Sequence, residues 1–171
     1  MMLRGSIGHV DELFAPPGNE WQPVSPRLAT MRRLVLLVLG LVVTALVAVL
    51  LAVATSALAT VGWVVLAALL LAWSFLMIGR NARSWAYAER DEDLYIKHGV
   101  LFRRLVSVPY GRMQYVDVQA GPLDQAFKIA NVHLHTASPS TTARIPGLNA
   151  EEAARLRDRL TSLGEAQAAG L

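Results

Sequence analysis

The run from Leu34 to Gly79 contains no Asp, Glu, Lys, Arg or His, so all acidic and basic residues of this 171-residue chain lie outside it. One helix needs about 20 apolar residues to cross the hydrocarbon core of a bilayer. The run is more than twice that length, and a polar pause, Ala54-Thr55-Ser56-Ala57, divides it into 34–53 and 61–79. The sequence therefore predicts a transmembrane helical hairpin over 34–79.

A cleaved signal peptide is the alternative for the first half of this run, since Ala57-Leu58-Ala59 has the small residues of a cleavage site. Signal peptides, however, have an apolar region of only about 7–15 residues close to the N-terminus. Here 33 residues precede a longer apolar stretch, and a second one follows. We therefore expect both spans to remain in the protein.

The charges that flank the hairpin predict its orientation. Positive residues stay on the cytoplasmic side of a membrane, and the connection between the two spans carries no charge. We expect a multi-pass protein of the inner cell membrane, with both termini cytoplasmic and with Trp85 and Tyr87 in the aromatic belt at the membrane surface. The flanking positive residues are Arg27, Arg32 and Arg33 before the first span, and Arg80, Arg83 and Arg90 after the second.

Small residues recur every four positions in the first span, at Gly40, Thr44, Ala48 and Ala52. Small side chains on one face let another helix approach closely in lipid. We favour the second span as the neighbour, with a matching face at Ala68 and Ala72, and keep a helix of another membrane protein or of a second copy as the alternative. Neither span contains an ionisable residue, which argues against a transporter or a proton relay.

The remaining chain divides into three segments. Residues 1–33 contain several prolines and are predicted to be a flexible cytoplasmic arm. Residues 85–164 have the length and pattern of one small folded domain, and 165–171 are expected to be a frayed tail. The net charge of +3 gives no strong polyanion signal, so no nucleic-acid partner is expected.

Within 85–164 the pattern changes to short strands with turn residues between them. Asn149 and Glu152 stand at the spacing of a capping box, and Ala153, Leu156 and Leu160 line one helical face up to Gly164. The fold class predicted is α+β: an antiparallel sheet closed by a C-terminal helix. Strands are expected at 94–98, 100–108, 113–120, 131–136 and 141–145, and a short helix or turn at 123–129.

Few residues in this domain have the spacing of a reactive site. His133 and His135 share one strand face and could ligate a metal, with His98 or Asp117 as a third ligand. Spacing places neither of these two beside the pair, and a solvent-facing strand explains the histidines better. Asp91-Glu92-Asp93 is best explained as a solvated edge. We expect no catalytic, metal or cofactor site.

Basic residues could instead contact anionic lipid headgroups or a protein partner, since each one held near a membrane surface contributes about 1 kcal/mol. Acidic residues interleave with them, so an ordinary mixed-charge surface is the alternative. The candidates are Arg80, Arg83, Lys97, Arg103, Arg104 and Arg112.

An ordered series of short motifs resembles the bacterial pleckstrin-homology-like (PH-like) domain of YdbS-type membrane proteins. The series is Val108-Pro109-Tyr110-Gly111-Arg112-Met113-Gln114-Tyr115-Val116, Gly121-Pro122-Leu123, Val132-His133-Leu134-His135-Thr136-Ala137 and Ile145-Pro146-Gly147-Leu148. The resemblance covers about Trp85 to Leu163 and, by architecture, the hairpin. One departure is Phe127-Lys128-Ile129-Ala130, where the family pattern leads us to expect a glycine turn.

The resemblance implies an antiparallel sheet closed by a helix, and no catalysis. Some members of the family are associated with membrane stress and resistance to antimicrobial peptides. From the residues and the resemblance together, we expect a non-enzymatic, membrane-anchored adaptor that works with a membrane protein partner. A peripheral sensor of anionic lipid headgroups is the alternative function.

Overall fold

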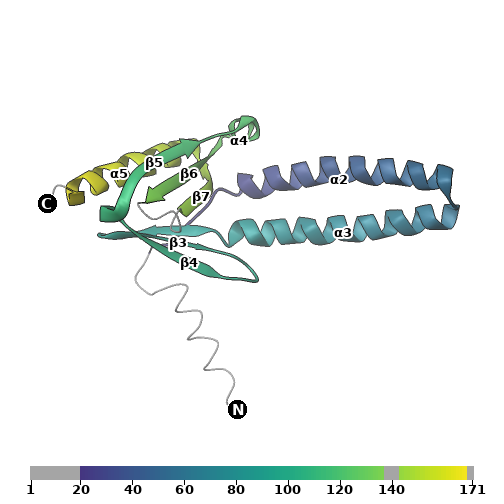
Figure 1. The fold of residues 1–171 in the computed structure, drawn as a ribbon, viewed down its shortest axis with the longest axis horizontal. Helices are drawn as coiled ribbons and strands as arrows, with labels where there is room; N and C mark the ends of the chain where they lie inside the picture. Colours follow the sequence, from purple (N-terminus) through teal and green to yellow (C-terminus); the bar gives the residue numbers. More distant parts are fainter. Residues whose placement is uncertain (1–19, 137–142, 169–171) are drawn as a thin grey trace, which may run out of the picture. The chain divides into compact units, whose positions relative to one another are not determined.

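A computed structural model of the chain describes residues 20–136 and 143–168. The chain forms two compact units, one of Met1–Leu28 with Asn81–Leu171 and the other of Ala29–Arg80. The second unit is a pair of long helices, and the first contains the strands found in the described residues (Figure 1).

Helices α2 (Arg27–Ala54) and α3 (Ala57–Arg83) are both long and apolar enough to cross a membrane. Each extends beyond the predicted spans 34–53 and 61–79, because helical hydrogen bonding continues past the apolar residues into the flanking arginines. The N–H of Arg27 lies 3.4 Å from Ser25 Oγ, in the manner of an N-terminal cap. The hairpin is thus two helices with a connection at Thr55-Ser56.

Within the helical unit, the first part of the predicted small-residue face contacts the second helix. A Cβ on Gly40 would lie 2.3 Å from Leu71 Cδ2, and Trp63 Nε1 donates to the Thr44 carbonyl at 3.3 Å. Ala52, by contrast, is exposed. Four residues turn a helix by about 40° more than one full turn, so Ala52 lies about 120° around from Gly40.

The matching face on α3 also differs from the expectation. Ala68 and Ala72 are exposed, while Ala67 is buried. The half-buried side chains of α3, such as Trp63 and Leu71, keep the spacing of three and four residues that a helical seam requires. The four-residue spacing therefore identified the first residues of the packing face, Gly40 and Thr44, but not the residues further along the helix.

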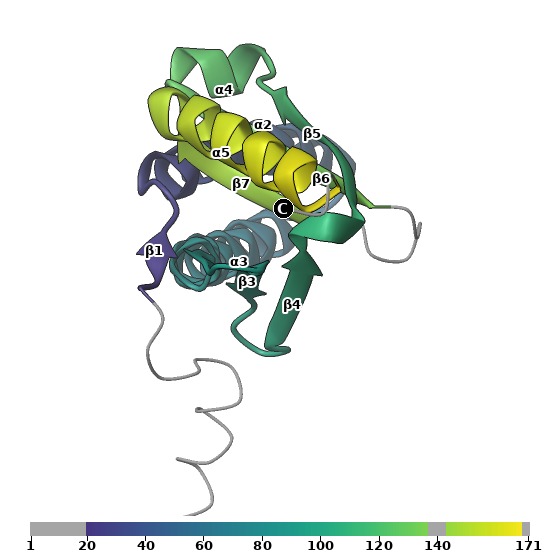
Figure 2. The same ribbon diagram turned by 90° about the vertical axis from the view of Figure 1, so that its left-hand side faces the viewer.

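The other unit contains two antiparallel sheets and one long helix. The first sheet has the order β1-β2-β3-β4 and the second the order β5-β6-β7. Helix α5 (Ala150–Ala168) lies along the second sheet (Figure 2), and its side chains also contact β2 of the first sheet. The strands are Gln22–Pro23, Ala86–Glu89, Asp93–His98, Arg104–Pro109, Met113–Gln119, Ile129–Thr136 and Ala143–Asn149.

Strand β1 precedes the helical hairpin in sequence and pairs with β2, which follows it. Gln22 lies opposite Tyr87, and Pro23 lies opposite Ala86. Leu28 is also buried in this unit. The expectation of a flexible arm over 1–33 is therefore wrong for residues 20–33, which are strand, buried segment and helix. Residues 1–19 lie outside the described part.

Two strand predictions are also corrected. The stretch 100–108 was expected to be one strand, but residues 99–103 form a turn and β4 begins only at Arg104. Gly99, with a φ of 107°, closes this turn. In β5 the pairing shifts between Met113 and Tyr115, and this β-bulge breaks the expected alternation of side chains.

Helix α5 closes the core of the domain through its apolar face. Ala153, Leu156 and Leu160 are buried, as the helical pattern predicts. Gly164 does not end the helix, which continues to Ala168, so the expected fraying from 165 does not apply to 165–168. The Glu152 carboxylate, expected in a capping box, instead accepts a hydrogen bond from the Tyr87 hydroxyl at 2.6 Å.

A polar cluster connects β2 to α5. Glu89, with its side chain only 9% exposed, binds Arg155 at 2.6 Å and Arg159 at 2.9 Å. Arg155 also binds Glu152, and this hydrogen bond lowers the pKa of the Glu152 carboxyl. Burial and the neighbouring Glu152 raise the pKa of the Tyr87 phenol. These contacts fix the helix on the first sheet as well as on the second.

Replacing Tyr87 with Phe is expected to lower the free energy of unfolding by about 2 kcal/mol at neutral pH, because a hydrogen bond to a charged group is lost. A raised pKa in the folded state gives stability that is present below pH 10 and lost as the pH rises further. The difference from wild type should therefore shrink above pH 10. Urea unfolding in detergent at two pH values measures both effects, and an unchanged difference would contradict this role of the phenol.

Lys128 lies in the stretch Phe127–Ala130, where the family pattern leads us to expect a glycine turn. It follows the short helix α4 (Pro122–Ala126) and has a φ of 55°. The glycine-like turn is thus preserved with an ordinary residue, at a cost of about 1–2 kcal/mol.

Lys128→Gly is accordingly expected to stabilise the protein by about 1 kcal/mol, since glycine adopts positive φ without this cost. Lys128→Ala is the matched control, because it removes the same charge and keeps the Cβ. Equal stability of the two variants in urea unfolding would show that the backbone strain is not the cause.

Candidate functional site

The structure brings part of the predicted basic set together at one end of the β3–β4 hairpin. His98 lies opposite Arg104, and Lys97 lies opposite Leu105. Arg103 and Arg104 are exposed. The N–H of Gly99 donates to Ser84 Oγ at 3.0 Å, so this end of the hairpin lies beside the residue that follows Arg83. We call Arg83, Lys97, Arg103 and Arg104 the basic end of the hairpin.

Two predicted residues do not belong to this basic end. Arg112 follows the opposite end of β4, where Pro109 lies opposite Asp93. Acidic residues gather at that opposite end, including Asp91 and Glu92. Arg80 belongs to the other unit of the chain. Arg83, Lys97, Arg103 and Arg104 are therefore kept away from the acidic residues Asp91–Asp93, while Arg112 lies near them, which the sequence order alone did not show.

The electrostatics of the basic end involve His98, which the sequence indicated only as a possible metal ligand. Burial, followed by the positive charges of Arg104 and Arg144, lowers the pKa of His98. Arg144 comes from β7 in the other sheet. The imidazole also stacks on Trp85, with 4.3 Å between the ring centroids. His98 is thus a neutral packing residue beneath the cationic groups.

Lys97 is the most enclosed of the basic residues. Its ammonium lies 3.9 Å from the centroid of the Trp21 ring, in a cation–π contact. Burial lowers the pKa of the Lys97 amine. Trp21, like β1, precedes the helical hairpin in sequence. This lysine therefore connects the N-terminal segment to β3.

The apex of the same turn is apolar. Leu101 is 83% exposed and Phe102 is 85% exposed. Among the described residues outside the two long helices, the other large apolar side chains that are exposed, Tyr115 and Leu123, are less so, at 57% and 53%. Sequence analysis placed Leu101 and Phe102 inside a strand, so their exposure is a finding of the structure.

Trp85 and Tyr87, expected at a membrane surface, are instead buried within the domain. The histidine pair also has a structural explanation: the His135 ring stacks on Tyr115 with 4.2 Å between centroids, and His133 lies opposite Asp117. In the part of the chain that the structure describes, no three His, Asp or Glu side chains gather as a metal site requires.

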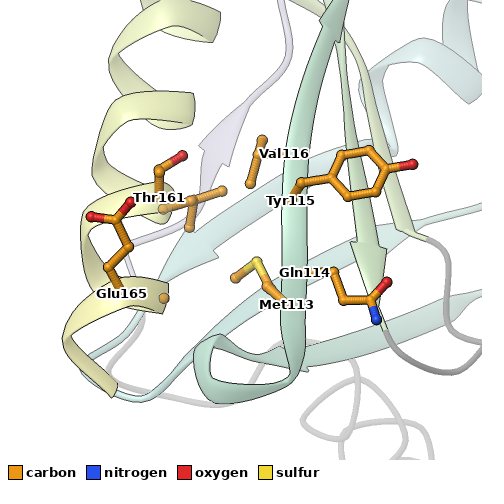
Figure 3. Close-up of a pocket in the computed structure, with 8 residues that line it drawn as sticks. Met113, Gln114, Tyr115, Val116, Thr161 and Glu165 are labelled. Carbon is orange, nitrogen blue, oxygen red and sulfur yellow. The ribbon is translucent and has the colours of Figure 1, made fainter. Parts of the chain in front are cut away.

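Two surface hollows were considered as ligand sites. The first, of about 180 Å³, lies between β5 and α5; Figure 3 shows Met113 and Val116 on the side of β5 that faces the helix, with Tyr115 on the other side. The second, of about 600 Å³, includes Lys128 and Glu151 in its lining. Both are open to solvent, and in the first the Thr161 hydroxyl donates to the Arg157 carbonyl at 2.9 Å.

In its described residues, this unit has seven strands in two sheets and a C-terminal helix that closes them. A protein-family model described as a bacterial PH domain matches residues 24–163, most of the chain. The chain belongs to the bacterial PH domain family. The PH-like fold expected from the motif series is confirmed, and the match includes both long helices.

One curated relative of this bacterial PH domain is the UPF0699 transmembrane protein YdbS of Bacillus subtilis (strain 168), 38% identical over 79 residues. The match covers 46% of this chain and 48% of the relative, so the chain spans about half the length of that protein. No solved structure matches the chain. The bacterial PH domain described here is a membrane protein with two candidate spans.

The motif residues that carried the family resemblance are parts of the fold. Tyr110 is fully buried, and its hydroxyl donates to the Arg90 carbonyl at 2.8 Å. Asn131 bridges the Asp124 carboxylate at 2.9 Å and the N–H of Gly147 at 3.1 Å. The motif series is therefore a signature of the bacterial PH fold and locates no ligand.

Proposed function

We propose that this bacterial PH domain is a non-enzymatic, membrane-anchored adaptor that presents its folded domain to a membrane protein partner on the cytoplasmic side. The supporting observation is the place of the helical hairpin, which is inserted between β1 and β2. Both helices continue into the same folded domain. The domain is thus held at the membrane at all times and needs no recruitment by a lipid.

A permanent anchor favours a protein partner in the same membrane. Tethering raises the effective concentration of two binding surfaces without any new contact. A soluble lipid sensor, by contrast, gains its output by moving to the membrane, and this domain cannot leave it. Tyr115, exposed and stacked on His135, supplies an aromatic side chain of the kind that is enriched at interfaces.

The pairing of β1 with β2 also supports the proposed topology. Gln22 and Tyr87 are neighbours in one sheet, so the hairpin between them crosses the membrane an even number of times. The arginines on both flanks favour the cytoplasm for this side. A reporter fused after Leu171 is expected to report the cytoplasm, and a periplasmic or outer signal would overturn the orientation.

Photo-crosslinking in native membranes tests the adaptor role. A crosslinking amino acid at Tyr115 or Leu123 is expected to give a discrete protein adduct, while one at Asp158, on the exposed face of α5, is the control. Mass spectrometry of the adduct distinguishes a foreign membrane protein from a second copy. Recovery of the uncrosslinked chain alone at both test positions would contradict the proposal. The family resemblance directs the search for a partner to envelope stress and antimicrobial-peptide resistance.

A sensor of anionic headgroups remains the second candidate, and the gathering of Arg83, Lys97, Arg103 and Arg104 at one end of the β3–β4 hairpin favours it. It predicts slower hydrogen exchange at Lys97–Arg104 in nanodiscs of anionic lipid than in neutral ones, with the difference lost at high salt. Equal exchange in the two lipids would reject it. Arg112, at the opposite end of β4, should not be involved.

A further inference from the structure

The β3–β4 turn has two exposed apolar residues at its apex and two arginines directly after them. Leu101 and Phe102 are adjacent and almost fully exposed, and Arg103 and Arg104 follow them directly. Membrane-surface segments use this combination, in which apolar side chains enter the boundary between headgroups and acyl chains and basic ones bind anionic headgroups. A mixed-charge protein surface has no need of two such exposed side chains.

The turn is tightly closed at its base. A Cβ on Gly99 would lie 1.9 Å from the Phe102 carbonyl oxygen, so the chain closes tightly on itself at this point. The base is packed, since the rings of Trp85 and His98 stack beneath it. The apolar apex is therefore presented by a fixed scaffold, which limits the entropy that would be lost on insertion.

Chain connectivity places this turn close to the membrane. Ser84, which accepts the hydrogen bond from Gly99, is the fourth residue after Arg80, where the helical unit ends. Four residues span at most about 14 Å. The acidic residues Asp91–Asp93 stand at the far end of β3, where they do not repel anionic lipid near the turn.

We propose that the β3–β4 turn is an interfacial membrane anchor, with Leu101 and Phe102 inserted into an anionic bilayer and Arg103 and Arg104 at its headgroups. The bilayer is the one that holds the hairpin. The anchor fixes the orientation of the domain on the membrane and does so whether or not the domain works as an adaptor.

Electron paramagnetic resonance of spin labels measures this insertion directly. The chain contains no cysteine, so Phe102→Cys gives one labelled site in the full-length protein, and its exposed side chain can be replaced without disturbing the core. Leu123→Cys is the matched control, an exposed apolar residue on α4. Both proteins are placed in phosphatidylglycerol–phosphatidylcholine nanodiscs, with one copy of the chain in each.

The label at 102 is expected to be several-fold more accessible to oxygen, relative to a polar nickel complex, than the label at 123. Arg103→Gln combined with Arg104→Gln should reduce this ratio, as should pure phosphatidylcholine. Equal ratios at 102 and 123 would overturn the proposal. Protection of the label at 102 from both reagents would also overturn it, because that result indicates contact with protein instead of lipid.

Discussion

Removing the helical hairpin and rejoining the domain is expected to give a water-soluble, folded protein. The change replaces residues 29–80 with a flexible linker between 1–28 and 81–171. Pro23 and Ala86 are cross-strand neighbours, about 5 Å apart. A linker of about ten glycine and serine residues has a root-mean-square length of about 17 Å. This length exceeds the separation of the two strand neighbours and leaves room for the residues that connect each strand to the linker.

The expected effect is large because the two parts of the chain are separate compact units. Both candidate membrane spans belong to the deleted segment except for their outermost turns. The rejoined protein should remain in the supernatant after ultracentrifugation without detergent, and its circular dichroism should show strand and helix together. Sedimentation with the membrane fraction or aggregation would show that the domain depends on the hairpin for its fold.

The fragment 85–171 is the informative control. It retains the whole region of the motif series but loses β1 and the buried side chain of Leu28. Without β1, the edge of β2 is open to pairing with other chains, and deletion of a buried leucine alone costs about 2–5 kcal/mol. We expect this fragment to be much less stable than the rejoined protein. Equal stability would mean that residues 20–28 are not part of the domain.

The sequence predicted the hairpin but not β1. The hairpin is visible in one continuous stretch of residues, whereas β1 depends on pairing with a strand that is distant in sequence. An uninterrupted apolar run is a local pattern with a simple physical cause, because unpaired charges are costly in lipid. Strand β1 has only two residues, one of them a proline, and its partner lies on the other side of the hairpin. No periodicity in 20–25 could reveal that pairing.

The candidate site also shows what a local sequence pattern cannot predict. Leu101 and Phe102 have the apolar character of strand residues, and a local pattern does not tell an exposed apolar pair from a buried one. Their exposure follows from the turn at Gly99 and from the register of His98 with Arg104. The sequence identified the basic residues individually. Only the strand pairing shows that Arg103 and Arg104 lie at one end of β4 and Arg112 at the other.

Gly147→Ala is expected to destabilise the protein by about 3 kcal/mol, the sum of backbone strain and overpacking. Gly147 has a φ of 68°, which a side chain disfavours. A Cβ there would lie 2.7 Å from Leu28 Cβ and 2.9 Å from both of its Cδ atoms. The Gly147 carbonyl also accepts the N–H of Ser25 at 3.0 Å, so displacement of Gly147 would release the segment that leads into α2.

Gly164→Ala is the matched control, since a Cβ there would meet the Tyr110 carbonyl at an ordinary 3.7 Å. In the interior of α5 it should stabilise by about 0.5–1 kcal/mol. Leu28→Ala combined with Gly147→Ala should cost less than the sum of the two single changes, because the two Cδ atoms that crowd the new Cβ are gone. Urea unfolding of the full chain in detergent measures all four proteins. Additive costs would show that the two Cδ atoms of Leu28 do not cause the strain, and a neutral Gly147→Ala would contradict both the backbone strain and the overpacking.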